Sequence, residues 1–539
     1  MMSFAPLLIL LGPLALVAAT AGSSAIVNAD AGDMARRSLL AAFVALGAAI
    51  VGAVCVIWAG PLATPTIGVF GAGLGVHLDA LSAVMFVLVA FLGVVVLRYS
   101  RNYMDGDARQ GDFLKWLSVT LAAVLVLIVS GNLAQFLAAW IATSLGLGKL
   151  LLFYPERQAA QLAARKEFLA SRLGDLCLVG VVVLCLAAFG TLEFGKIFDT
   201  ARTMAAEGRS SGLITVAALL IVIAALLKSA QLPFHGWLTE VMETPTPVSA
   251  LLHAGIINAG GFLVLRMSDL LVLGAGALPL LAIVGGATAL FASVVMLTQT
   301  SVKVSLAWST IAQMGFMLLQ CGLGAFSAAL LHIVAHSLYK AHAFLSSGSV
   351  IDLARSSWSP SPGGQPHPAR IVIALLAVFA VTLGVGALFG ATLDQKPGAF
   401  TLAAILLMGL THLIANAIDE RPNSFVVLRV AALALGVAVA YFALQAVAEW
   451  LMAGTLPPTM PASGALDLAL AGLVILSFSA VTIFQSVMAL RAGSPAWLAL
   501  HTHLANGLYL NTMANRLVLQ LWPPAAAPAS SSATVNTKA

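Results

Sequence analysis

The stretch from Lys228 to His253 brings three ionisable side chains into a region that is otherwise largely apolar. Lys228, Glu243 and His253 supply an ammonium, a carboxylate and an imidazole, whose protonation states change readily on burial. Together these groups could hand a proton along. The alternative is a set of satisfied polar groups that only fixes a hinge. His235 and Glu240, nearer the predicted membrane surface, suit either role equally.

Three prolines interrupt the helical pattern of the same stretch. Pro233 lacks the amide donor that a helix interior needs, and Pro245 and Pro247 favour an extended segment before the next helix begins. Broken backbone at membrane depth is tolerated only where it lies against protein or water. The break therefore predicts an ion pathway beside it.

A second group of ionisable residues recurs at helical spacing. His332, His336 and Lys340 are four residues apart, which places all three on one stripe of a single helix. A lone buried histidine is more often a structural hydrogen-bonding group, but three groups in register along one span predict a relay for a charge. His342 lies off this stripe and is given no role.

Other polar residues fall in or beside neighbouring predicted spans. Lys303 opens the span before the histidine stripe, in which Thr310 and Gln313 could hold water between charged stations or simply join helices. Asp175 follows Arg172 closely enough to pair with it. We predict that Lys303 and Asp175 also belong to the pathway.

The sequence contains no recognisable cofactor or metal site. It has no Gly-rich nucleotide loop, no HExxH motif, and four cysteines that lie singly within predicted spans. His501 and His503 are two residues apart on a predicted helix and so point in different directions. We therefore expect a chain without its own cofactor, metal or enzymatic activity, and without a nucleic-acid partner.

The composition says where these groups must sit. The chain of 539 residues is 60% hydrophobic and only 9% charged, whereas soluble domains carry about 25% charged residues. Apolar runs recur at about the 20-residue length that crosses ~30 Å of hydrocarbon as a helix. Backbone groups in lipid must pair within their own segment, so each run predicts a helix. The fold class is therefore all-α and polytopic, with about 14–15 transmembrane helices.

The predicted spans are residues 5–22, 38–60, 78–98, 113–131, 132–152, 169–190, 212–230, 244–265, 272–297, 302–321, 324–349, 369–391, 400–418, 425–447 and 466–489.

Basic residues divide unevenly between the two predicted ends of these spans. Eighteen of the 26 Lys and Arg residues fall on one side, five fall on the other, and Lys149, Lys228 and Lys340 fall within spans. By the positive-inside rule the richer side is cytoplasmic. This predicts an inner-membrane protein with its amino terminus in the periplasm and its carboxyl terminus in the cytoplasm.

The segment from Ser494 to Trp522 has an amphipathic mix of residues beyond the last predicted span. We predict that it docks a partner, although an ordinary helix lying on the membrane surface would look the same. The residues expected to make that contact are Trp497, Leu504, Leu508, Tyr509 and Arg516. The polar residues that follow are expected to be disordered.

Several of these segments resemble the antiporter-like subunits of respiratory complex I (NADH-quinone oxidoreductase subunit L/5-like) and of multisubunit cation/proton antiporters. The resembling segments are 78–82, 98–104, 228–253, 302–315 and 332–348, so the likeness spans roughly residues 70 to 350. It implies that Lys228 is a channel lysine and Glu243 the acid after the break. It implies likewise that the stripe of two histidines and Lys340 is the central relay.

The resemblance also implies a core of two inverted five-helix repeats, each with a broken helix. The expected divisions are three amino-terminal helices in 1–112, a first repeat in 113–266, a second repeat in 267–420, further helices in 421–490 and a cytoplasmic tail in 491–539.

Two departures from the family pattern stand out. Relatives carry a glutamate after the tryptophan of the fifth span, but here Trp140 is followed by Ile141, so Lys228 is expected to lack its usual carboxylate partner. The twelfth span, 371–392, lacks the buried lysine of the second half-channel. Both departures argue against a standard proton-pumping subunit of a respiratory NADH or ferredoxin dehydrogenase. That function and a cation/proton antiporter subunit are the alternatives.

Four segments, 140–157, 232–238, 251–262 and 503–509, are more similar to the DabB family, the membrane subunits of DAB inorganic-carbon accumulation complexes. This resemblance implies a large cytosolic DabA-like partner, which is similar to zinc β-carbonic anhydrases and would convert CO2 to bicarbonate. Zinc is expected in that partner. This chain would supply the path for protons or sodium through the lipid bilayer, and inward ion flow would drive the partner.

Overall fold

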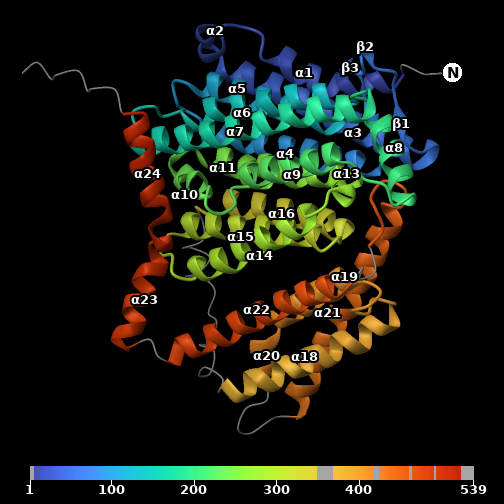
Figure 1. Cartoon of the computed structure of the whole chain (residues 1–539). Coiled ribbons are helices and arrows are strands. Elements are labelled where there is room, and N and C mark those ends of the chain that lie inside the picture. Colours follow the sequence, from blue (N-terminus) through green and yellow to red (C-terminus); the bar gives the residue numbers. More distant parts are fainter. Residues whose placement is uncertain (1–4, 349–367, 418–423, 460–463, 491–492, 524–539) are drawn as a thin grey trace, which may run out of the picture.

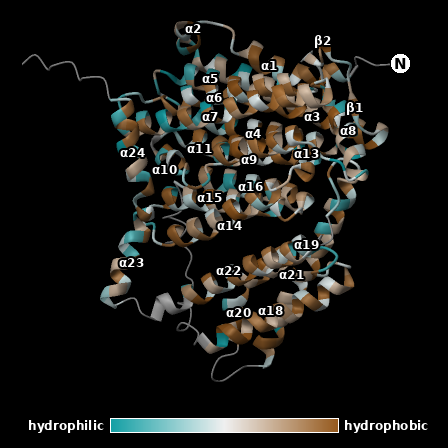
Figure 2. Ribbon diagram, in the orientation of Figure 1, coloured by the Kyte–Doolittle hydropathy of each residue, from teal (hydrophilic) through white to brown (hydrophobic). Residues whose placement is uncertain are grey.

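The computed structural model describes residues 5–348, 368–417, 424–459, 464–490 and 493–523 (Figure 1). The axes of most helices are roughly aligned with one another, and the two carboxyl-terminal helices α23 (Pro495–Ala505) and α24 (Leu510–Leu521) cross one end of this bundle (Figure 1). Hydrophobic residues cover the bodies of the helices, and hydrophilic residues gather at the two ends of the bundle (Figure 2). This is the distribution that a membrane imposes on a bundle of spanning helices.

The amino-terminal helices form one edge of the bundle. Their bounds are η1 Ala5–Leu10, α1 Leu11–Ala19, α2 Ser24–Ala29, α3 Ala31–Ala59 and α4 Ala80–Tyr103. Between α3 and α4 lie four short strands, β1 Leu62–Ala63, β2 Ile67–Val69, β3 Ala72–Leu74 and β4 His77–Leu78. These pair antiparallel as β1 with β4 and β2 with β3. The all-α prediction omitted these two small pairings because the strands are only two or three residues long.

The next helices carry the first predicted repeat. Their bounds are α5 Gln110–Val129, α6 Leu133–Leu151, α7 Gln158–Phe189, α8 Phe194–Ala206 and α9 Gly212–Lys228. The helix α7 packs along both α6 and α9. It begins eleven residues before the predicted span of 169–190. This additional part contains the charged residues Lys166 and Glu167, which are buried against other parts of the protein.

The predicted break follows α9 and is longer than expected. Its elements are α10 Gly236–Glu240, η2 Val241–Glu243, α11 Thr246–Ala254, η3 Ile256–Asn258 and α12 Ala259–Arg266. Thr244 and Pro245 are extended, as predicted, but Pro247 lies inside the first turn of α11, where a missing amide donor is harmless. A second interruption, at Gly255, follows the end of α11 at Ala254 and was not predicted.

The second predicted repeat and the remaining helices complete the bundle. Their bounds are α13 Ser268–Leu273, α14 Ala277–Met296, α15 Val302–Gly322, α16 Phe326–Leu345, α18 Pro368–Leu388, α19 Pro397–Met408, α20 Thr411–Ala417, α21 Ser424–Leu451 and α22 Ala465–Leu490. The pair α19 and α20 is bent by 47° at its break. Helical interruptions therefore occur in both predicted repeats, after α9 and at Gly255 in the first and between α19 and α20 in the second.

The tail crosses the end of the bundle at which α10 lies (Figure 1). It consists of α23 Pro495–Ala505, η4 Gly507–Tyr509 and α24 Leu510–Leu521. Residues 524–539, for which disorder was predicted, lie outside the described residues. So do Arg355, Arg421, Arg491 and Lys538, four of the basic residues that were counted for the orientation.

Every predicted span overlaps a helix of the structure. Eleven helices of the described residues are long and apolar enough to cross a membrane, and α19 with α20 makes a twelfth if the bent pair is one span. Two shorter apolar helices, at 6–19 and 212–228, and the polar helix α16 account for the other predicted spans. The chain is a polytopic α-helical membrane protein.

Candidate functional site

Lys228 is the last residue of α9 and lies inside the protein at the start of the break. Its ammonium donates a hydrogen bond of 2.7 Å to the Ser144 hydroxyl of α6. It also lies 5.2 Å from the centre of the Trp140 ring, within range of a cation–π interaction. An ammonium 5% exposed in a membrane protein needs such partners, because hydrocarbon cannot solvate it.

Two carboxylates of α7 complete the surroundings of Lys228. Glu167 and Asp175 lie within electrostatic range of the ammonium, and Glu167 is 3% exposed. The Glu167 carboxylate accepts a 2.6 Å hydrogen bond from the Ser171 hydroxyl. Asp175 forms the predicted pair with Arg172, at 2.8 Å. The family's usual carboxylate is absent after Trp140, where Ile141 stands, and the acids within electrostatic range of Lys228 come instead from α7.

A cavity of about 520 Å³ reaches this group from the end of the bundle that carries the tail. Its lining includes Ser144, Gln161, Arg165, Glu167 and Trp522. A cavity with charged and hydroxyl side chains in its wall can hold water. Glu167 borders this cavity, and Lys228 is joined to its wall through the hydrogen bond to Ser144.

His253 belongs to a second cluster, in which hydrogen bonds join α11, α15 and α16. Its Nδ1 lies 3.0 Å from the Thr310 hydroxyl, which donates to the Leu306 carbonyl at 3.0 Å. The same carbonyl accepts a 3.1 Å hydrogen bond from the Lys340 ammonium. The His253 ring stacks on Phe344 with 4.3 Å between ring centres, and its Nε2 has no partner among the described residues.

The predicted stripe on α16 is present, and its members meet different neighbours. His336 Nε2 lies 3.3 Å from the His253 carbonyl oxygen, and the rings of His332 and His336 are 6.0 Å apart. Lys340 is completely buried. Lys303 lies at the beginning of α15, half-buried, where its ammonium donates to the Thr246 hydroxyl at 3.1 Å. The structure thus brings His253 of α11 next to His336 of the α16 stripe. Lys303 lies apart from them, at the first residue of α11, Thr246.

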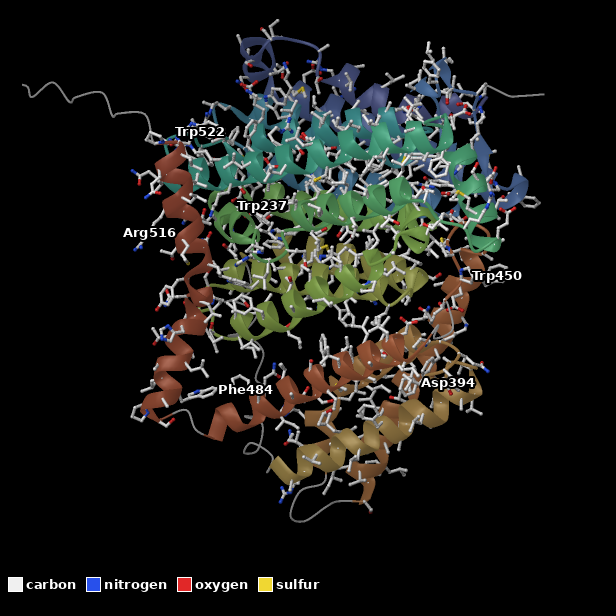
Figure 3. The ribbon with its side chains drawn as sticks, in the orientation of Figure 1. Trp237, Asp394, Trp450, Phe484, Arg516 and Trp522 are labelled. Carbon is white, nitrogen blue, oxygen red and sulfur yellow. The ribbon has the colours of Figure 1, made fainter. Side chains whose placement is uncertain are left out.

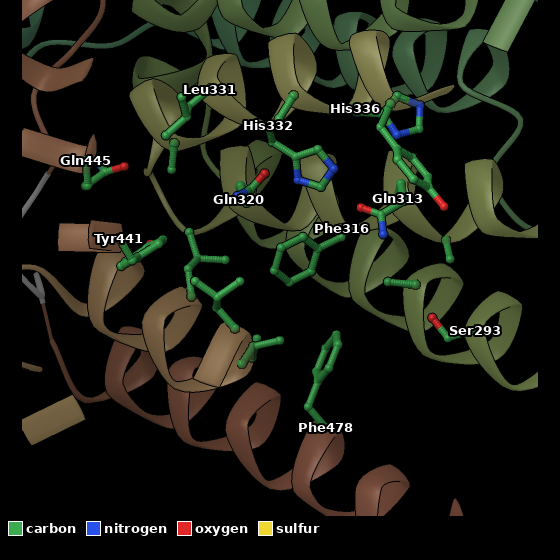
Figure 4. Close-up of a pocket in the computed structure, with 18 residues that line it drawn as sticks. Ser293, Gln313, Phe316, Gln320, Leu331, His332, His336, Tyr441, Gln445 and Phe478 are labelled. Carbon is green, nitrogen blue, oxygen red and sulfur yellow. The ribbon is translucent and has the colours of Figure 1, made fainter. Parts of the chain in front are cut away.

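A second cavity, of about 560 Å³, opens beside the two histidines of the stripe (Figure 4). Its polar lining comes from α15, α16 and α21, and includes Gln313, Gln320, Tyr441 and Gln445. The remaining lining is apolar and includes Phe316 and Phe478, which face one another across ring centres 6.0 Å apart. Gln313 and His332 therefore border the same space, as the predicted role for Gln313 required.

Two side chains of the break have different outcomes. His235 is fully buried against the Trp308 ring, 5.0 Å away, and neither ring nitrogen has a partner among the described residues. The side chain of Glu243 lies outside the described part of the chain. The predicted role of Glu243 therefore stays a prediction.

Sequence reasoning missed two polar residues of this interior, Glu167 and Asn258. Glu167 was overlooked because its neighbours Arg165 and Lys166 placed it outside a predicted span. Asn258, whose side chain donates to the Ser337 hydroxyl at 2.8 Å, carries no signal of its own in the sequence.

A third unforeseen cluster links the tail to the break. Lys166 of α7 and Glu240 of α10 form a 2.6 Å ion pair. The Lys166 ammonium also donates to the side-chain oxygens of Asn511 and Asn515 of α24, both at 2.7 Å. Those two amides donate to Glu240 at 2.8 and 2.7 Å. The inner face of α24 is therefore fastened to this chain itself.

The predicted docking residues of the tail are only partly available. Trp497 packs on Phe484 with 5.4 Å between ring centres, and Leu504 is buried. Leu508 and Tyr509 are exposed, and Arg516 points away from the bundle (Figure 3).

A buried ion pair lies at the opposite end of the bundle. The Arg266 guanidinium of α12 donates to both oxygens of Asp79, at 2.6 and 3.1 Å, and also to the Ser82 hydroxyl. Asp79 caps the first turn of α4 as well. This bidentate pair joins α12 to α4. Among the described residues, no group of three His, Cys, Asp or Glu side chains could hold a metal ion.

Known proteins resemble the chain over the region that holds both clusters. Residues 130–383 match the family model described as NADH:quinone oxidoreductase/Mrp antiporter, and residues 65–114 match the amino-terminal model of complex I chain 5. The probable inorganic carbon transporter subunit DabB2 of Halothiobacillus neapolitanus is 41% identical over 464 residues, which cover 85% of this chain and 83% of that protein. The chain belongs to the DabB family.

Two further proteins are similar to the chain. The probable DabB subunit of Hydrogenovibrio crunogenus is 48% identical over 284 residues, which cover 52% of this chain and 54% of that protein. The Mrp complex structure from Dietzia sp. matches 96% of this chain and 57% of its own, with a TM-score of 0.56 and 23% identity. The last likeness concerns the fold alone. The chain is thus a polytopic membrane protein with an antiporter-like domain, as the sequence predicted.

Proposed function

We propose that this chain conducts protons, or alternatively sodium, through the bacterial inner membrane as the membrane subunit of an inorganic-carbon accumulation complex. It performs no catalysis of its own. The conversion of CO2 to bicarbonate takes place in a large cytosolic DabA-like subunit that holds zinc. This cargo is supported by the names of the two DabB relatives, which are probable inorganic carbon transporter subunits.

The observation that carries the ion-conducting role is the burial of two lysines in hydrogen-bonded polar clusters. Lys228 and Lys340 are 5% and 0% exposed inside a protein whose surroundings are apolar. Insertion of a lysine at the bilayer centre costs ~2.5–3.5 kcal/mol on biological scales. A chain that needed only stable packing would gain by replacing these ammonium groups with apolar side chains. The two buried lysines are explained if a charge moves past them.

Protons reach the first station through the cavity that Ser144 and Glu167 line. A proton arriving on the Glu167 carboxylate passes to Lys228 through water, since no direct hydrogen bond joins the two side chains among the described residues. The polar residues of the break then lead towards His253. The Thr310 hydroxyl and the Lys340 ammonium both donate to the Leu306 carbonyl, which has no proton to pass on, so water carries the proton between His253 and Lys340.

The orientation also belongs to this proposal. The tail and the cavity beside Arg165 lie at one end of the bundle, and the first described residue lies at the other (Figure 1). The end rich in basic residues is cytoplasmic by the positive-inside rule. The amino terminus is then periplasmic, and the tail faces the cytosolic partner.

Coupling to the partner requires that protonation favour one of two conformations. The Lys166–Glu240 pair provides a connection, because it holds α24 on one side and belongs to the segment after Lys228 on the other. The outward side chains Leu508, Tyr509 and Arg516 are the partner-facing part of the tail.

Growth in air tests the proposal. The chain and its partner are expressed together in a bacterium that lacks carbonic anhydrase. We expect growth that requires both proteins, fails with an uncoupler, and is lost in Lys228→Ala and Lys340→Ala. The matched control is Lys196→Ala, which removes an exposed lysine at the other end of the bundle. Growth that persists in both buried-lysine variants would refute the ion-conducting role.

A subunit of a respiratory dehydrogenase is the second candidate, because both matched family models are named for complex I proteins. In that case the chain would co-purify with redox subunits that carry iron–sulfur centres. Purification from the native membrane separates the two candidates, since a carbon-accumulating complex would instead bring down a zinc protein.

A further inference from the structure

The cavity beside His332 and His336 extends towards the carboxyl-terminal helices, which lie outside the two predicted repeats (Figure 4). Its wall includes Gln320 of α15 and Gln445 of α21, which are 5% and 4% exposed. The side-chain oxygen of each has no hydrogen-bond partner among the described residues. Buried amide oxygens without partners are unfavourable unless water reaches them.

The volume is sufficient for a chain of water molecules. At ~30 Å³ for each molecule of liquid water, a cavity of about 560 Å³ has room for roughly 15 to 20 molecules. Tyr441 also lines this space, and its hydroxyl donates to the Ala399 carbonyl at 3.3 Å. Polar groups therefore stand on both walls, the histidines on α16 and the α21 side chains opposite.

A charged pair continues this polar line towards the membrane surface. The Gln445 amide donates to Glu449 at 3.2 Å, one turn further along α21. Glu449 pairs with Lys396 at 2.6 Å and accepts a 2.7 Å hydrogen bond from the Thr459 hydroxyl. The neighbouring residues Asp394 and Trp450 lie at the end of the bundle opposite the tail (Figure 3). Glu449 and Lys396 are partly exposed there.

We propose that the ion path leaves the protein through this cavity, with Gln445 as the inner positioning residue and the Glu449–Lys396 pair as the outer station. This inference rests on the proposed function. A proton released from the histidines moves along the cavity water, binds the Glu449 carboxylate as it separates from Lys396, and then passes to bulk water. The helix α21, outside both repeats, thereby becomes part of the conducting unit.

The wild-type chain and its variants are reconstituted with the partner in liposomes that contain a pH-sensitive dye. Gln445→Leu keeps the side-chain size and removes the amide, and Glu449→Gln removes the charge. We expect each to lower proton flux at least about tenfold, equivalent to ~1.4 kcal/mol in the barrier. The matched control is Leu444→Ala, which alters the neighbouring, lipid-facing side chain of α21.

A labelling experiment asks directly whether the cavity is wet. Ser293 lines it, so Ser293→Cys is treated in intact membranes with a charged, membrane-impermeant thiol reagent. Modification above the background of the four native cysteines is expected. Modification only after detergent solubilisation would mean that a lipid chain fills the space, and it would overturn the proposal.

The outcomes separate this inference from the proposed function. A conducting wild type with unchanged flux in Gln445→Leu and Glu449→Gln refutes the exit route alone. A wild type without flux refutes conduction and the route together. Elution of each variant as a single peak in size-exclusion chromatography shows that lost flux does not reflect lost folding.

Discussion

The attachment of α24 to the break can be tested by removing one amide. Asn515→Ala deletes one hydrogen bond from the Lys166 ammonium and one to the Glu240 carboxylate, both 2.7 Å long. Alanine is an excellent helix former, so α24 itself keeps its helical propensity. The variant therefore weakens the attachment and not the helix.

The magnitude follows from the two lost bonds. A hydrogen bond to a charged group contributes ~1.5–3 kcal/mol, and the lower figure applies where the site is partly hydrated. Two such bonds amount to about 3 kcal/mol, or roughly a 150-fold change in the equilibrium for local opening. Asn511 still holds the ion pair from its own position, so the opening stays confined to the tail.

Hydrogen–deuterium exchange measures this opening directly, because amide exchange in a folded segment follows its local unfolding. In Asn515→Ala we expect the amides of Leu510–Leu521 to exchange on the order of 100-fold faster, with α7 unchanged. Asn506→Ala is the control, since the Asn506 side chain bonds only to Thr502 of its own helix. Equal exchange of α24 in the two variants would refute the attachment.

Three further outcomes are expected. Glu167→Gln should reduce proton flux about tenfold or more, and unchanged flux would contradict the role of this acid. Adding Ile141→Glu to that variant should restore part of the flux, because position 141 lies one turn before Ser144, the partner of Lys228, on the same face of α6. Asp79→Asn leaves the Arg266 guanidinium without its charged partner and should lower the free energy of unfolding in detergent by about 3–5 kcal/mol. The double variant Asp79→Asn with Arg266→Met should recover most of this loss, and equal losses in the single and double variants would argue against a buried pair. Gly236→Ala should also loosen α24, since the new Cβ would collide with the Asn511 side-chain oxygen, and exchange at wild-type rates would contradict that packing.

The histidine stripe and the main break were accessible from sequence because local rules determine them. Four-residue spacing puts His332, His336 and Lys340 on one face of any helix, whatever surrounds it. A proline inside an apolar run interrupts a helix for reasons within the chain itself. These features depend on neighbours along the sequence, and both are present in the structure.

Glu167 was not accessible in the same way. Its partner Lys228 is 61 residues away, and their proximity depends on the packing of α7 against α9. The low hydropathy around Lys166 also moved the predicted start of the span to residue 169, although α7 begins at Gln158. Hydropathy assigns charged residues to water, whereas here other protein groups solvate them.

The tail illustrates the opposite difficulty. Its apolar residues were interpreted as a contact for a partner, but Asn511 and Asn515 are the residues that fasten it to this chain. They are four residues apart and therefore on one face of α24, a signal that was available but has no meaning without the charged pair beneath it.

Proton flux into liposomes is the most direct test of the central claim that buried ionisable side chains carry the ion. The complex is reconstituted with the wild-type chain, with Lys228→Met, with Lys340→Met, or with Lys196→Met as the control, and a pH gradient is applied. We expect wild-type flux in the control and flux at the level of empty liposomes in both buried-lysine variants. Flux equal to wild type in Lys228→Met and Lys340→Met would contradict it.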